Sequence, residues 1–226
     1  MSLVSPDLSH TTLAEKTRSR LQEAILLGEF EPGQRLQVDE LARWMGTSPM
    51  PVREALRDLH AVGLVEVIPY KGARVAGLSK DDLRDLYDVR LALESLAVRR
   101  AAERFTAEQE ESARGALREY IEVFAGDDIA EAWRAGVAYH LEIYAASGSE
   151  RLVRQIRPLM AQGRRYHLRW PPPLDRKRRR LSERLLEACV QHDPESAEQQ
   201  LRELLTHGQR YIAAKLEDEE PADRAT

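Results

Sequence analysis

Two prolines, one residue apart, constrain the stretch TSPMPVREALRDL at positions 47–59. Proline has no backbone N–H and damages a helix interior, whereas the first turn of a helix makes no intrahelical use of that group. The stretch is therefore predicted to begin a helix, with Ser48 as its N-cap and with Pro49 and Pro51 in its first turn. Four apolar residues then recur at helical spacing and predict a buried face: Val52, Ala55, Leu56 and Leu59.

A second face of the same predicted helix carries Met50, Arg53 and Arg57, three and four residues apart. One methionine and two arginines would thus project from a rigid helix start. Two earlier helices are predicted, an amphipathic one over 13–27 and a short one over 38–45. A turn of about three residues joins the short helix to the proline-led one, which is typical of a helix-turn-helix.

Two β-rich runs, at 64–68 and 73–76, flank the sequence PYKG at positions 69–72 and indicate a hairpin. Three helices plus a two-stranded wing predict an N-terminal winged helix-turn-helix, a DNA-binding domain, over residues 9–78.

From Ser79 onward the sequence shows no strand signals and is mainly α. Short links between helices favour an all-α antiparallel helical bundle over residues 79–218, followed by a flexible tail at 219–226. Six helices are predicted, at about 79–104, 107–125, 127–147, 150–169, 177–192 and 194–216.

Composition gives no global sign of nucleic-acid binding. The net charge of the 226 residues is −4, and residues 1–78 hold nine Lys and Arg against ten Asp and Glu. Any signal for DNA binding must therefore be local. At 226 residues the chain could form one large domain or two of ordinary size, and its 42% of hydrophobic residues is enough to build real cores.

Several function classes have no support in the sequence. No apolar run approaches the roughly 18 residues of a membrane span, and the start has no signal-peptide pattern, so a cytoplasmic protein is expected. The single Cys189 lies among apolar helix residues and is predicted to be a buried structural thiol. Without an H-E-x-x-H, G-x-S-x-G or P-loop pattern, an enzyme is not expected.

Three segments resemble the N-terminal domain of the GntR family of bacterial transcription regulators: AILLGEFEPGQRL, DELARWMGTSPMPVREALRDLHAVGLV and PYKGARV. The later DLYDVRLALESLAVRRAA resembles the start of the FCD-type effector domain of its FadR branch. The resemblance implies that the third helix and the wing tip read DNA. The implied contacts are Ser48, Met50, Arg53, Lys71 and Gly72, and Arg57 shares the face of Arg53.

Arg53 matches the arginine of the family's VREAL and is the best candidate for a bidentate contact to guanine. A surface salt bridge with a neighbouring acid is the structural alternative. Gly72 would let the wing backbone approach the minor groove, or supply the φ that the hairpin requires. The chain departs from its relatives at Pro49, where most of them carry an arginine, so a changed half-site preference is predicted.

Many FCD-type domains hold a divalent metal with an aspartate and three histidines. By the resemblance only His140 is kept here, since the other positions hold Gly136, Ser182 and Leu204. No metal cofactor is therefore expected, and a shifted set using His140 and His207 is the one alternative.

The implied effector site centres on Arg90 and His140. In related domains an arginine at this place meets the carboxylate of an effector, and an ion pair with Glu94 is the equally weighted alternative. His140 either bonds a ligand or is a satisfied core histidine. Residues 151–180 hold ten arginines and one lysine against one acid, so Arg164, Arg165 and Arg169 are further candidates for holding an anion. Long-range attraction of DNA phosphates is another functional alternative, and a solvated face is the usual meaning of such a run.

Together these features predict a ligand-responsive transcription regulator, a homodimer that represses at a palindromic operator and responds to a small anionic metabolite. A structural adaptor, with the winged unit contacting protein, and a helical-domain enzyme are the alternatives.

Overall fold

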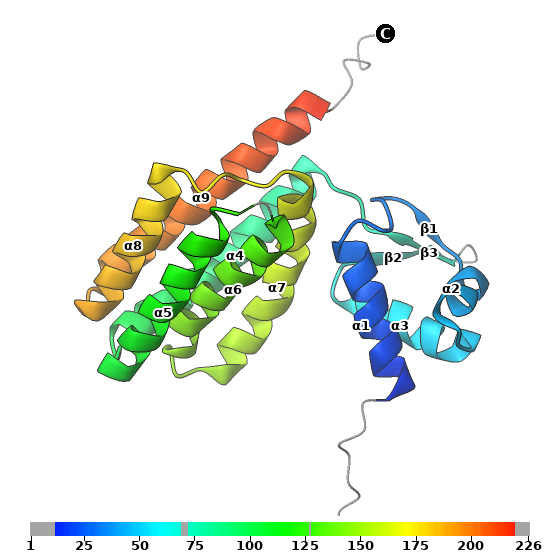
Figure 1. The fold of residues 1–226 in the computed structure, drawn as a ribbon, viewed down its shortest axis with the longest axis horizontal. Coiled ribbons are helices and arrows are strands. Elements are labelled where there is room, and N and C mark those ends of the chain that lie inside the picture. Colours follow the sequence, from blue (N-terminus) through cyan, green and yellow to red (C-terminus); the bar gives the residue numbers. More distant parts are fainter. Residues whose placement is uncertain (1–11, 69–71, 127, 220–226) are drawn as a thin grey trace, which may run out of the picture. The chain divides into compact units, whose positions relative to one another are not determined.

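The computed structural model describes residues 12–68, 72–126 and 128–219. The chain divides into two compact units at Gly77 and Leu78, called here the N-terminal unit and the helical unit (Figure 1). Each unit has its own hydrophobic core, and each is described by itself.

The N-terminal unit contains the three predicted helices. Thr12 and Glu15 form a capping box at the start of the first helix, which fixes where it begins. Gly46 ends the second helix with φ +63°, a left-handed conformation that favours glycine. The bounds are α1 Leu13–Leu26, α2 Val38–Met45 and α3 Pro49–Ala61.

The predicted two-stranded wing is part of a three-stranded antiparallel sheet with the order β1-β3-β2. The predicted pair is β2 Val65–Ile68 and β3 Gly72–Val75, and the strand that the sequence did not predict is β1 Arg35–Leu36. Two residues are too few for a period-two pattern, and this strand exists because its backbone pairs with β3.

The described residues of the helical unit form the six predicted helices. They are α4 Lys80–Ala102, α5 Ala107–Val123, α6 Ile129–Ala145, α7 Glu150–Arg169, α8 Arg176–Val190 and α9 Pro194–Glu219. Side-chain caps explain most of the starts, since Ser79, Thr106, Asp128, Ser149 and Asp175 each accept a hydrogen bond from a backbone N–H of the first turn.

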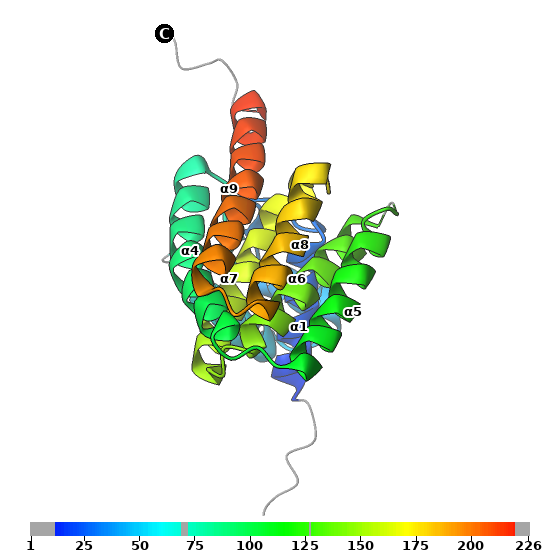
Figure 2. The same ribbon diagram turned by 90° about the vertical axis from the view of Figure 1, so that its left-hand side faces the viewer.

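In the helical unit, α9 packs between α4 and α8, and α5 packs against α6 and α8 (Figure 2). Cys189 is buried in this core, and burial raises the pKa of its thiol to about 12, so it remains a protonated structural residue. Across the described ranges, no helix is both long enough and apolar enough to cross a bilayer.

Candidate functional site

The start of α3 is built as the two prolines predict. Ser48 is the N-cap, Pro49 occupies the first helical position and Pro51 is buried in the first turn. The Ser48 side chain makes no capping hydrogen bond within the described part of the chain. A capping serine normally accepts from the second or third N–H of the helix, and Pro51 has none to give. The Ser48 hydroxyl is therefore left for a partner outside the helix.

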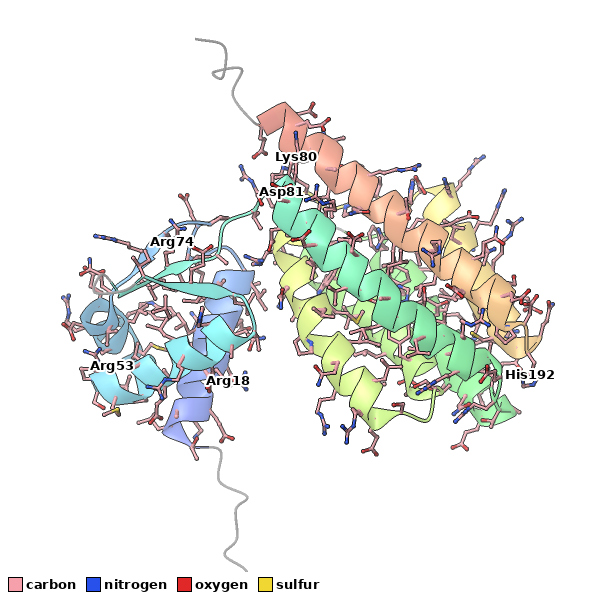
Figure 3. All side chains as sticks on the ribbon, turned by 180° about the vertical axis from the view of Figure 1, so that it is seen from behind. Arg18, Arg53, Arg74, Lys80, Asp81 and His192 are labelled. Carbon is pink, nitrogen blue, oxygen red and sulfur yellow. The ribbon has the colours of Figure 1, made fainter. Side chains whose placement is uncertain are left out.

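The exposed face of α3 carries the predicted side chains. Met50 is 64% exposed, and Arg53 and Arg57 are also exposed (Figure 3 labels Arg53). In the residues that the structure describes, neither arginine forms an ion pair, so the described residues give the salt-bridge alternative for Arg53 no partner. The opposite face is buried as predicted, with Val52 and Leu59 fully enclosed. Two guanidiniums without an ion-pair partner among the described residues thus project from a helix whose opposite face is buried.

The predicted wing residue Gly72 has a backbone conformation that favours glycine. Gly72 begins β3 with φ +93°, so the hairpin needs a glycine there whatever the backbone contacts. Lys71 lies outside the described residues. Arg74, the next basic residue along β3, pairs with Glu66 at 2.6 Å between Nη2 and Oε2 and is thereby occupied.

Replacing Pro49 with arginine should add a charged donor at the exposed first position of α3. If the new guanidinium reaches a base, preference at one half-site position should change by about 1 to 3 kcal/mol. Duplex selection with the wild type, Pro49→Arg and the control Pro49→Ala measures this. Identical preferred sequences for all three proteins would contradict the importance of this position.

The helical unit encloses a cavity of about 110 Å³. Polar side chains line part of it, namely Tyr87, Arg90, Tyr120, His140, His167 and Arg178. The apolar lining includes Phe124, Ile129, Trp133, Val137, Met160, Leu204 and Leu205. The structure thus brings the two predicted residues, Arg90 and His140, to one cavity, and it adds Arg178 and His167.

Arg90 forms the buried ion pair with Glu94 that was the structural alternative, and it also lines the cavity. Its Nε donates to Glu94 Oε1 at 2.7 Å, and Glu94, completely buried, also accepts from the Tyr144 hydroxyl. The guanidinium lies over the ring of Tyr87, 4.9 Å from its centroid. Arg90 Nη1 is buried and has no hydrogen-bond partner among the described residues. One end of this guanidinium is therefore fixed and the other is unsatisfied.

The two cavity histidines are neutral at pH 7. Burial, together with the nearby Arg178 and Arg90 charges, lowers the pKa of His140 to about 3 and holds the pKa of His167 well below its ordinary value. His167 Nε2 bonds the Tyr87 hydroxyl at 3.0 Å, whereas His140 Nδ1 is buried without a partner among the described residues. Among the described residues, His140 Nδ1 therefore lacks the partner that a satisfied core histidine would have.

This neutrality predicts that the helical unit loses stability as the pH falls from about 6.5, where the histidines of the unfolded chain take up protons. The folded His140 takes up its proton only near pH 3. Each such histidine contributes a slope of at most about 1.4 kcal/mol per pH unit. Urea unfolding at pH 7, 6 and 5 measures how the free energy of unfolding changes with pH. This dependence should be flatter for His140→Gln than for the wild type or for the control His192→Asn, which replaces an exposed histidine. The same pH dependence in all three proteins would contradict the neutrality of the buried His140.

Arg164 and Arg165 were predicted as candidates for holding an anionic effector, but neither residue lines the cavity. Arg165 is buried beside Asp82, with 3.5 Å between Nη2 and Oδ2, and lies over the ring of Tyr166. The arginine-rich segment supplies the cavity with Arg178 instead. The sequence showed the density of charge but not which arginine points inward, since that depends on where α8 begins.

The shifted metal set is also not assembled. His207 Nε2 bonds Asp175 Oδ2 at 3.0 Å, and His207 does not line the cavity that His140 lines. Within the ranges that the structure describes, no three side chains of His, Cys, Asp or Glu gather as a metal site would require.

Comparison with known families agrees with this geometry. Residues 13–75 match the bacterial regulatory proteins of the gntR family, and residues 85–207 match the FCD domain. The first range covers the winged unit, and the second covers the helices that surround the cavity.

Individual relatives extend the match along the chain. The "Probable D-xylose utilization operon transcriptional repressor" of Paenarthrobacter nicotinovorans is 34% identical over 154 residues, which are 68% of each chain. The "HTH-type transcriptional repressor GlaR" of Escherichia coli K12 is 32% identical over 66% of this chain and 70% of that relative. The solved structure of E. coli McbR/YncC, 25% identical, superposes with a TM-score of 0.77 and covers 91% of this chain and 99% of its own. The chain therefore belongs to the GntR family of bacterial regulatory proteins, among the members that carry an FCD domain.

Proposed function

We propose that this protein is a ligand-responsive repressor of the FadR branch, which binds operator DNA through α3 and a small anionic metabolite in the helical unit. The observation that carries the proposal is that one chain combines two exposed arginines at a helix start, without ion pairs among the described residues, with a charged internal cavity. Membership of the family makes the protein a DNA-binding regulator and not an enzyme. Repression is proposed because two of its relatives are named as repressors.

The proposed working form is a homodimer on a palindromic operator. Two third helices reading successive major grooves would stand about 34 to 36 Å apart, so the operator would mirror the two-fold symmetry of the protein. On α4, Val89 and Leu96 are 48% and 41% exposed and lie seven residues apart on one face, which supports an apolar contact between two copies. Sedimentation should show a dimer, and monomer alone at micromolar concentration would contradict the proposal.

Gel shift with genomic fragments tests the regulator itself. Fragments should include the DNA upstream of the protein's own gene, at moderate salt, with and without small carboxylic acids. A sequence-selective complex that a ligand weakens is the expected result, and the cytoplasm is the proposed location of such a regulator. Absence of any sequence-selective complex would contradict the proposal.

A further inference from the structure

The metal of many FCD domains does not fit the residues of this cavity. A Cβ at Gly136, the first expected ligand position, would lie 3.0 Å from Cε2 of Tyr120, so the ring already fills that space. Leu204 lines the cavity with an apolar side chain, and the Ser182 hydroxyl donates within its own helix to the Arg178 carbonyl at 3.1 Å. His140 is left without the partners that a divalent ion needs.

Arg178 supplies positive charge to the same cavity. It lies in the first turn of α8, behind the Asp175 cap, and its Nε donates to the Tyr120 hydroxyl at 2.9 Å. In the described part of the chain, Arg178 forms no ion pair. The ring that occupies the first metal-ligand position therefore also orients this guanidinium.

The described charges around the cavity do not balance. Among the residues that the structure describes, Arg178 and Arg90 are positive, Glu94 is negative, and the two lining histidines are neutral, which leaves one positive charge. Arg90 Nη1 and His140 Nδ1 are both buried without partners among the described residues. Buried polar groups in native proteins are normally hydrogen-bonded, so these two atoms point to a ligand that satisfies them.

The rest of the lining limits the size and nature of that ligand. Trp133, Phe124 and Val137 offer an apolar wall, and Ile129, which also lines the cavity, is 45% exposed. The volume of about 110 Å³ is slightly below the roughly 150 Å³ of an engineered cavity that holds benzene. A small ring or a short branched chain therefore matches the space.

We propose that this cavity binds a small monocarboxylate with an apolar body directly, without a divalent metal, its carboxylate lying between the Arg178 and Arg90 guanidiniums. This inference rests on the proposed function, because it assumes that the effector occupies this cavity. Planar guanidiniums recognise carboxylates by paired hydrogen bonds, which allows arginine to take over recognition from a metal.

Calorimetric titration of the full-length protein with benzoate, after dialysis against EDTA, tests the proposal. We expect saturable binding of one benzoate per chain that added Zn²⁺ or Mn²⁺ leaves unchanged. Benzamide, which has the same shape without the charge, and phthalate, which brings a second charge, should bind at least about tenfold more weakly. Binding only after a metal is added, or equal binding of benzamide, would overturn the proposal.

Variants locate the site. Arg178→Gln should weaken benzoate binding by about 10- to 150-fold, because a hydrogen bond between charged groups is lost. Arg176→Gln is the matched control, since Arg176 is exposed in the same turn of α8 and does not line the cavity. Circular dichroism confirms that each variant is folded, and the comparison of benzoate with benzamide on the wild type needs no variant. Equal affinity of Arg178→Gln and wild type would overturn the assignment.

The outcome separates this inference from the proposed function. If the protein shifts operator fragments but binds none of benzoate, phenylacetate, isobutyrate and acetate, the proposed monocarboxylate ligand is wrong. The proposed function as a DNA-binding regulator would then still be supported. If benzoate binds but no selective DNA complex forms, the cavity assignment stands and the proposed function is wrong.

Discussion

Replacing Arg53 with alanine should weaken operator binding by about 1 to 3 kcal/mol, a factor of about five to 150. The guanidinium is exposed, has no ion-pair partner among the described residues, and stands in the second turn of a helix whose start is fixed by Pro49 and Pro51. A bidentate contact to one guanine would be lost, so the affinity for the correct site should approach that for competitor DNA. Fluorescence anisotropy with an operator duplex and with a competitor duplex measures both affinities.

Arg57→Ala is the informative comparison. Arg57 lies one turn further along the same exposed face. If Arg57 meets a phosphate, its loss should weaken binding equally to the operator duplex and to the competitor duplex. The slope of log affinity against log salt concentration should then become smaller by about one. An unchanged operator affinity for Arg53→Ala would instead favour the adaptor alternative, in which the winged unit contacts protein.

The Glu94→Gln variant should destabilise the helical unit by about 3 to 5 kcal/mol. Glu94 is completely buried and compensates the buried Arg90 guanidinium through the bond at 2.7 Å. Glutamine keeps the shape but removes the charge, so Arg90 would remain buried and charged with nothing to balance it. Urea unfolding followed by circular dichroism measures the loss.

Glu198→Gln provides the matched control. Glu198 also bonds two groups, Arg99 and Arg202, each at 3.0 Å, but these arginine side chains are 40% and 52% exposed. Pairs open to solvent contribute at most about 1 kcal/mol, so this variant should unfold nearly like the wild type. Equal effects of the two substitutions would show that the Glu94 pair is no more important than a surface pair.

Most of the fold was predictable because sequence patterns within single segments indicate the same helices that packing in the two cores requires. The prolines of α3, the caps of the later helices and the apolar periodicity each indicate an element by themselves. Strand β1 was not predictable, since two residues gain their conformation only from pairing with β3.

The site was predictable only in part, for a geometric reason. Arg90 and His140 follow from motifs on single helices, and both line the cavity. Arg178 and His167 come from an arginine-rich region where sequence alone does not distinguish the inward side chain. Which one points inward depends on where α7 ends and α8 begins, and Asp175 sets the second of these points as the N-cap.

Selection from a pool of random duplexes by the full-length protein is the decisive test of sequence reading by α3. We expect enrichment of two inverted half-sites spaced for successive major grooves, with Arg53→Ala losing the preference at one base pair in each half-site. A final pool from the wild type that is no more ordered than the starting pool would contradict it.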